Sequence, residues 1–209
     1  MLFRSWSEGR EPRPETIQSC GLEECVAQGA AAIGWDDKYG NARWRRVAGK
    51  PHLRRGIGVA TVMQGTAIPY LDMGGASIKI NDDGSFNLLV GATDLGTGSD
   101  TVLAQQAAEV LGVPLDDIIV YSSDTDFTPF DKGSYASSTT YISGRAVRRA
   151  AEVVRAELLD IASDLLGERA VELQGDFARS ASGKQVAIAA VARESLYGPR
   201  KRQIQGMAS

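Results

Sequence analysis

Two short stretches of the sequence have residue types and spacings suited to holding a ligand. The first, residues 91–101, reads GATDLGTGSDT. Gly96 and Gly98 would let a ligand approach the backbone, and Ser99 begins a predicted helix whose first N–H groups lack partners within the helix. Such a helix start attracts anions and polar rings. This stretch is therefore a candidate binding loop, with an ordinary tight turn as the alternative.

The same stretch differs from the two common phosphate-binding motifs. A P-loop needs Gly-Lys-Ser/Thr, but the nearest downstream lysine is Lys132. A dinucleotide fingerprint needs a third glycine, and Thr101 stands at that position. The sequence therefore disfavours a generic phosphate-binding domain.

The second stretch, residues 133–140, reads GSYASSTT and directly precedes a long predicted helix. Ser137, Ser138, Thr139 and Thr140 bring four hydroxyls to that helix start, although one would suffice as a cap. The surplus favours a polar ligand, and a Ser/Thr-rich cap with solvent-facing hydroxyls is the alternative. If the two helix starts face each other, they form a neutral donor pocket, but spacing alone does not establish this.

The elements around the first stretch form a strand, glycine-rich turn, helix and strand. The apolar alternation predicts strands over 76–80 and 85–90, joined as a hairpin through residues 81–84. A helix from Ser99 to Leu111 would be capped by Ser99 and stopped by Gly112, with a strand over 118–121 after it.

The elements around the second stretch are a long loop and a long helix. Residues 122–137 form a sixteen-residue loop, long enough to suggest a binding role. Apolar positions from Ile142 to Leu165 then predict a helix reaching Gly167, about 40 Å long. A turn at 182–184 and a helix over 188–196 follow. With a further strand predicted over 56–64, the fold class is α+β, a mixed β-sheet with packed helices.

The amino-terminal part reads as a separate piece. Residues 1–15 look like a linker or arm, Ser19 can cap a helix through Ile33 that Gly34 ends, and 35–55 show no sustained period. We therefore expect a connecting arm and short helix over 1–50, and a partial α+β domain over 51–209.

Composition limits the function classes. A net charge of −3 gives no overall argument for nucleic acid or an anionic membrane, and the charged start fits a cytoplasmic protein better than a secreted one. Two cysteines, expected to be buried thiols, and one histidine make a self-contained metal site improbable. Charge is uneven: residues 80–131 hold ten acids and no base, whereas 43–55 hold six bases and no acid. Each block reads as a solvated face or an assembly contact.

Taken together, the motifs resemble the molybdenum-cofactor-binding subunit of the xanthine dehydrogenase and aldehyde oxidase family. The resemblance is carried by residues 91–114, by Asp124-Thr125-Asp126 with Pro129, and by 136–140 followed by Gly144. Their order and gaps also match. The resemblance runs from near Trp6 to the end of the chain and is strongest between residues 56 and 150.

The resemblance implies the molybdopterin-binding domain of a molybdenum hydroxylase. Such an enzyme hydroxylates an N-heterocycle or an aldehyde with oxygen from water and passes two electrons onward. The implied cofactor is molybdenum-molybdopterin, as such or as the cytosine dinucleotide, with FAD and 2Fe-2S on partner subunits or domains. Its implied cofactor-binding residues are Gly96, Thr97, Gly98, Ser99, Ala136, Ser137, Ser138, Thr139 and Thr140. Implied partners are the rest of the molybdenum subunit, the iron-sulfur and flavin subunits, and the small substrate, with no nucleic acid and no membrane.

Several positions depart from the family pattern. Thr97 stands where many members have glutamine, and Thr66 where purine-oxidising members place an aromatic ring, so the substrate stays open. The family's catalytic base is a glutamate in a Gly-Glu segment, but Gly167-Glu168 reads as the end of the long helix. We assign no catalytic and no metal-ligating residue, and expect an incomplete, inactive fragment of the subunit. A non-catalytic α+β assembly module is the alternative function.

Overall fold

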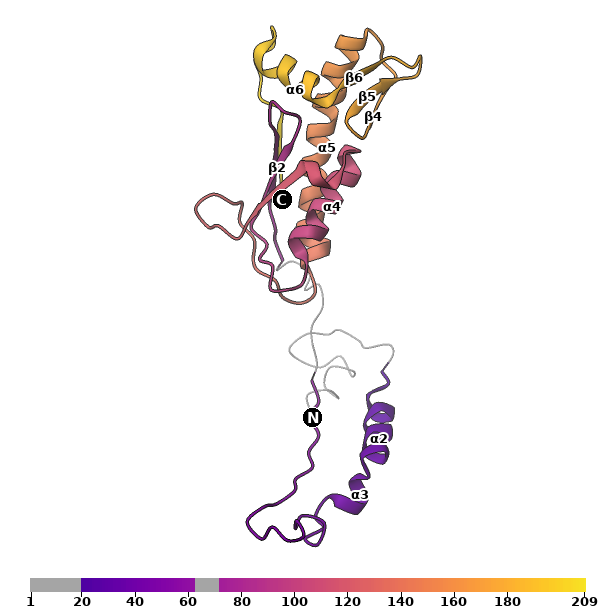
Figure 1. The fold of residues 1–209 in the computed structure, drawn as a ribbon, viewed down its shortest axis with the longest axis vertical. Coiled ribbons are helices and arrows are strands. Elements are labelled where there is room, and N and C mark those ends of the chain that lie inside the picture. Colours follow the sequence, from indigo (N-terminus) through magenta and orange to yellow (C-terminus); the bar gives the residue numbers. More distant parts are fainter. Residues whose placement is uncertain (1–19, 63–71) are drawn as a thin grey trace, which may run out of the picture. The chain divides into compact units, whose positions relative to one another are not determined.

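The computed structural model describes residues 20–62 and 72–209, in two compact units that divide between Val62 and Met63 (Figure 1). The predicted arm over 1–15, the Ser19 cap, the end of the 56–64 strand and Thr66 lie outside the described residues. The predicted boundary after residue 50 falls inside the first unit. Within the described residues, no helix combines the length and apolar character needed to cross a bilayer.

The first unit contains the predicted helix, α2 (Leu22–Ile33), which ends at Gly34 in the left-handed conformation with φ 64°. The segment predicted to be irregular also contains a one-turn helix, α3 (Trp35–Lys38). The ring of Trp35 stacks on that of Tyr39, which follows this helix. The strand predicted from residue 56 is wrong over 56–62, because this stretch pairs with no described strand and an isolated extended segment is not stable. Cys20 and Cys25 are exposed free thiols, contrary to the buried pair that we expected.

The second unit contains a four-stranded mixed sheet in the order β3-β2-β1-β7. The predicted hairpin is present, with β1 (Ala76–Ile80) antiparallel to β2 (Phe86–Val90). β3 (Ile118–Ser122) lies parallel to β2, as its crossover through a helix requires. β7 (Gln205–Ala208) pairs antiparallel with β1 and was not predicted. The α+β fold class with a mixed sheet and packed helices is confirmed.

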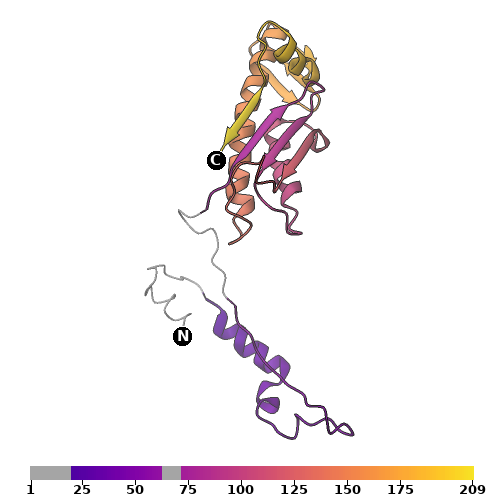
Figure 2. The ribbon, with the colours of Figure 1, turned by 90° about the vertical axis from the view of Figure 1, so that its left-hand side faces the viewer.

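Two helices cover one face of this sheet and create the core (Figures 1 and 2). They are α4 (Ser99–Leu111) and α5 (Thr139–Leu166), both close to their predicted bounds. Alternate residues of β1 and β2 are buried, so one row of apolar side chains on each strand packs against the helices. The largest fully buried side chains include Phe86, Ile78, Leu88, Leu103, Val147 and Val154.

Beyond the sheet, a smaller antiparallel layer packs near the carboxyl end of α5. It contains β4 (Val171–Gln174), β5 (Phe177–Ser180) and β6 (Gln185–Ala187), followed by α6 (Ile188–Tyr197). The predicted turn over 182–184 joins β5 to β6, and the predicted helix corresponds to α6. A 3-10 turn, η1 (Leu115–Asp117), links α4 to β3.

Candidate functional site

The first candidate loop leaves β2 at Gly91 and enters α4 at Ser99. A Cβ on Gly91 would lie 2.2 Å from the carbonyl oxygen of Pro129, so glycine lets the loop pass the 122–137 segment closely. Gly96 and Gly98 have φ angles of 88° and 73°, in the left-handed region that favours glycine. The helix cap is Gly98, with no side-chain cap bond, so our prediction that Ser99 caps α4 is wrong.

Asp94 already satisfies the backbone donors of this loop, which we expected to be free for a ligand. Its Oδ1 accepts the N–H groups of Gly96 at 2.8 Å and Gly98 at 3.1 Å, and its Oδ2 accepts that of Asp100 at 3.4 Å. Desolvation raises the pKa of Asp94, but these backbone bonds outweigh it and hold the pKa below its ordinary value. The amino end of α4 therefore carries an internal carboxylate, which occupies these backbone donors.

The second candidate loop approaches α5 through two strained residues. Ala136 and Ser137 have φ angles of 50° and 54°, a conformation that non-glycine residues rarely adopt. Ser138 precedes the first helical residue, and its Oγ donates to the carbonyl of Tyr135 at 2.9 Å. The loop is therefore fixed by its own bonds, leaving the Thr139 and Thr140 side chains at the helix start.

Direct bonds join the two loops, as the facing arrangement requires. Ser134 Oγ donates to the carbonyl of Thr93 at 2.7 Å, and Ser123 Oγ donates to that of Ala92 at 3.3 Å. From further along α4, Gln106 Nε2 donates to the carbonyl of Thr140, in the first turn of α5, at 3.2 Å. The two helix starts therefore lie side by side.

A cavity of about 350 Å³ opens where the loops meet. Its lining comes from both loops: Leu95, Thr97, Ser99, Ser134, Tyr135, Ala136, Ser137, Thr139 and Thr140. Six of the nine predicted site residues are among them. The other three, Gly96, Gly98 and Ser138, belong to the two loops but do not line the cavity. None of the lining residues is charged, so the cavity is the neutral pocket that the sequence suggested.

Ser99 gives this pocket an unused polar group. The residue is 5% exposed, and its Oγ has no hydrogen-bond partner among the described residues. A buried hydroxyl without a partner is costly, because it has lost its hydrogen bonds to water. A ligand in the cavity that Ser99 lines would supply the missing partner.

Four positions of the candidate site were missed or left out of the prediction: Asp94, Leu95, Ser134 and Tyr135. Asp94 could have been suspected as an Asx residue shortly before glycines, since such side chains accept backbone bonds two residues on. Ser134 and Tyr135 belong to the quoted motif, but nothing in their spacing showed that they line the cavity. The Tyr135 hydroxyl donates to Asp72, a bond that raises the pKa of Tyr135.

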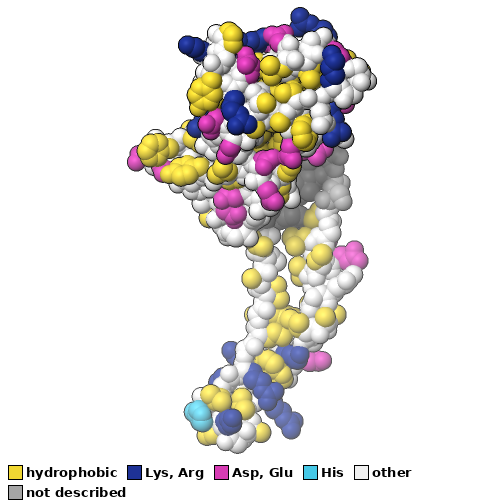
Figure 3. All heavy atoms as spheres, turned by 45° about the horizontal axis from the view of Figure 1, so that its top comes forward, with side chains coloured by type: hydrophobic (Ala, Val, Ile, Leu, Met, Phe, Trp, Pro, Cys, Tyr) yellow, Lys and Arg dark blue, Asp and Glu magenta, His cyan; other side chains and the backbone are white. Residues whose placement is uncertain are grey.

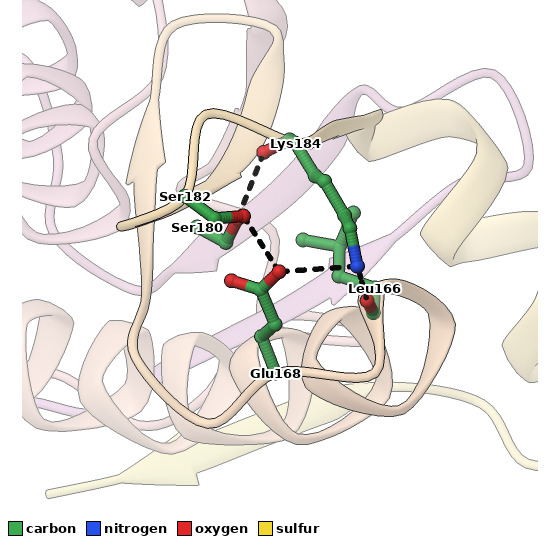
Figure 4. A network of polar contacts seen from close by, with 5 residues as sticks. All are labelled: Leu166, Glu168, Ser180, Ser182 and Lys184. Carbon is green, nitrogen blue, oxygen red and sulfur yellow. Dashed lines mark hydrogen bonds and ion pairs between the residues drawn. The ribbon is translucent and has the colours of Figure 1, made fainter.

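The Gly-Glu pair forms a structural lock, as its place at the helix end suggested (Figure 4). Gly167 ends α5 in the left-handed conformation. Glu168 Oε1 accepts from Ser182 Oγ at 2.6 Å and pairs with Lys184 Nζ at 3.1 Å. The Ser182 bond first, then those from Ser180 and Lys184, lower the pKa of Glu168 to about 2. A carboxylate so firmly ionised is a poor proton acceptor.

The comparisons with known proteins agree with this geometry. Residues 28–208 match the family model for the molybdopterin cofactor-binding domain. The chain is 43% identical over 169 residues to the probable hypoxanthine oxidase XdhD of Escherichia coli K12, covering 80% of this chain and 17% of that protein. It is 38% identical over 160 residues to the xanthine dehydrogenase molybdenum-binding subunit of Escherichia coli O157:H7, covering 75% and 21%.

Solved structures of molybdenum enzymes have a similar fold. Quinoline 2-oxidoreductase from Pseudomonas putida 86 superposes with a TM-score of 0.61 at 25% identity, covering 67% of this chain and 19% of that one. The Cu,Mo-CO dehydrogenase superposes with a TM-score of 0.59 at 28% identity, covering 65% and 18%. The chain thus spans about a fifth of the length of these proteins. It belongs to the molybdopterin cofactor-binding domain family of the xanthine dehydrogenase and aldehyde oxidoreductase molybdenum subunits.

Proposed function

We propose that this chain is part of the molybdenum-binding subunit of a xanthine dehydrogenase-like hydroxylase, in which it positions the molybdopterin cofactor. The observation that carries the proposal is the convergence of two hydroxyl-bearing helix starts on one uncharged cavity. Membership of the molybdopterin cofactor-binding family supports it independently.

The residues around the cavity fit the pterin. A pterin presents ring N–H groups, ring nitrogens and a carbonyl, and neutral hydroxyls can donate to or accept from each of these. The orphaned Ser99 Oγ and the side chains of Thr97, Thr139 and Thr140 provide such hydroxyls. The uncharged lining suits a ring system whose charge varies between neutral and anionic.

In this proposal the loop residues divide into contacts and supports. Thr97, Ser99, Ala136, Ser137, Thr139 and Thr140 contact the pterin, while Gly96, Gly98 and Ser138 hold the backbone in place. Because Asp94 and the loop bonds fix these donors before binding, little reorganisation accompanies it. When bound, the cofactor supplies the two-electron chemistry that hydroxylates an N-heterocycle or an aldehyde with oxygen from water.

The remaining parts of the enzyme lie outside this chain in our proposal. They are the rest of the molybdenum subunit with its catalytic glutamate, and iron-sulfur and flavin partners carrying 2Fe-2S and FAD. We propose a cytoplasmic enzyme with the cofactor as molybdopterin or its cytosine dinucleotide. Alone, the 209 residues would bind cofactor poorly and would not catalyse.

The test is cofactor content in the complete subunit in which we place this chain. We expect Thr139→Ala and Ser138→Ala to lower both molybdenum content and pterin fluorescence. Ser195→Ala is the matched control, because it removes a buried hydroxyl of α6 that bonds the Ala192 carbonyl at 2.8 Å, outside the cavity lining. Unchanged occupancy in both loop variants, or equal loss in the control, would contradict the proposal.

A further inference from the structure

A compact loop in the first unit brings arginines together. Asn41 Oδ1 accepts the N–H groups of Arg43 and Trp44, each at 3.0 Å, and starts the turn. The chain then returns on itself, with the Arg55 N–H donating to the Arg45 carbonyl at 2.9 Å. Arg46 and Arg54 face each other in an antiparallel bridge. Figure 3 shows Lys and Arg side chains gathered along this part of the unit.

Three of these arginines line one cavity, which we call the arginine cradle. The cavity measures about 340 Å³ and is lined by Ala42, Arg45, Arg46 and Arg54. Arg54 Nη1 donates to the carbonyls of Pro51 and Leu53, at 2.6 and 2.7 Å. In the described part of the chain, no carboxylate forms an ion pair with any of the three.

The hydrogen bonds of this loop act against the repulsion between its arginines. Like charges placed directly opposite in an antiparallel pair repel each other. Residues 20–62 also contain no buried residue, so apolar burial within the unit does not offset the ordering of its chain. An external group that neutralises the guanidinium groups would stabilise the loop.

A second cavity beside the cradle indicates which kind of molecule carries the group that neutralises the arginines. It measures about 260 Å³, shares Arg45 with the cradle, and is lined by Lys38, Tyr39, Gly40, Trp44, Arg45, Gly56 and Ile57. Aromatic and aliphatic surface next to a cation suits a protein segment that carries apolar and acidic side chains together.

We propose that the arginine cradle binds the carboxylates of an acidic protein segment, with an apolar side chain of that segment in the adjoining cavity. The planar guanidinium fork matches a carboxylate in two parallel hydrogen bonds, which lysine cannot reproduce. This docking site lies in the first unit and does not depend on cofactor binding.

The test is a titration of the full chain with hexaglutamate and with the same peptide carrying one central leucine, followed by tryptophan fluorescence because Trp44 lines the second cavity. The leucine peptide should bind the more tightly of the two. We expect saturable binding at about 20 mM salt that weakens strongly at about 200 mM. Arg45→Glu with Arg46→Glu should weaken it about tenfold or more. The matched control, Arg169→Glu with Arg193→Glu, makes the same charge change on exposed residues of the second unit and should weaken it far less.

Several outcomes would overturn this inference. They are the absence of binding at low salt, an equal loss in the control pair, and tighter binding of pyrophosphate or an oligothymidylate than of hexaglutamate. A charge-keeping variant, Arg45→Lys with Arg46→Lys, separates folding from binding. We expect it to keep its circular dichroism spectrum and part of the affinity, because the charge stays while the two parallel hydrogen bonds are lost. Undiminished affinity would contradict the guanidinium recognition proposed here.

Discussion

The Ser99 hydroxyl is the buried group of the cavity that a ligand would provide with a hydrogen-bond partner in our proposal. Its Oγ is buried without a partner, so the group contributes nothing to the ligand-free fold. By contrast, the hydroxyl of Ser143, also buried, donates to Asp131 at 2.6 Å and holds the 122–137 segment against α5. Two buried serines of the second unit thus differ: one lacks a hydrogen-bond partner and the other has one.

Replacing these serines should separate binding from stability. We expect Ser99→Ala to leave the melting temperature of the chain unchanged or slightly higher, and to lower molybdenum content in the complete subunit. Ser143→Ala should destabilise the chain by about 1–3 kcal/mol, because Asp131 loses its donor. Calorimetry and metal analysis measure the two effects. A lower melting temperature with full molybdenum content in Ser99→Ala would contradict the assignment.

Asp94 makes the first loop sensitive to acid. Its pKa lies below the ordinary value, so its bonds to the loop are fully present above the pKa of the unfolded chain and are lost as pH falls through the lowered value. We expect the amide proton shifts of Gly96 and Gly98 to titrate with a midpoint below 3.8. In Asp94→Asn this titration should disappear. A wild-type midpoint at or above 3.8 would show that the carboxylate is not held as described.

At the scale of elements, the start of α5 is positioned by close contact with α4. A Cβ on Gly144 would lie 2.3 Å from Gln106 Oε1, in the side chain that also holds the Thr140 carbonyl. Gly144→Ala should therefore displace the Gln106 amide and break its bond to the Thr140 carbonyl, destabilising the second unit by about 0.5–1.5 kcal/mol and lowering cofactor content.

A glycine elsewhere provides the control for that substitution. Gly29 lies in α2, and no atom would lie within 4 Å of an added Cβ. Gly29→Ala should not lower the free energy of unfolding, because alanine has a higher helix propensity than glycine. Urea denaturation compares the two variants. Equal stability of both would show that Gly144 is not needed for the helix contact.

The lock between α5 and the small sheet has its own pH dependence. The pKa of Glu168 falls to about 2 in the folded chain. Its stabilisation is therefore complete above the ordinary value of 4.5 and is lost as pH falls toward 2. In Glu168→Gln, thermal unfolding should lose part of its pH dependence in that range. Glu152→Gln is the control, since its exposed pair with Arg148 spans 3.9 Å and contributes little. Identical pH profiles in wild type and Glu168→Gln would refute the lock.

At the scale of the whole molecule, the sequence predicted what depends on local pattern. The alternation of apolar and polar residues predicted the β1–β2 hairpin, and the helical spacing of apolar residues predicted α4 and α5. β7 escaped prediction because its partner β1 is distant in the chain and Gly206 weakens its strand pattern. That glycine is needed because its Cβ would lie 2.3 Å from the Ala150 carbonyl of α5.

In the candidate site too, features of local sequence could be predicted and features of tertiary structure could not. Hydroxyls and glycines at two helix starts could be recognised from residue type, and the family resemblance from their order. The bonds from Asp94 to the amino end of α4 could not be predicted in this way. They depend on how the loop folds around the Asp94 carboxylate. The bond from Ser134 to the Thr93 carbonyl, which joins the loops, likewise depends on tertiary structure.

The central claim is that both loops contact one ligand, and cysteine protection tests it most directly. In the complete subunit, with Cys20 and Cys25 replaced by serine because both are exposed, single cysteines at Thr97 and Thr140 would be labelled with maleimide. The account predicts that bound cofactor slows labelling at both positions and leaves a cysteine at exposed Arg193 unaffected. Protection of one loop without the other, or of neither, in variants that retain their molybdenum would contradict it.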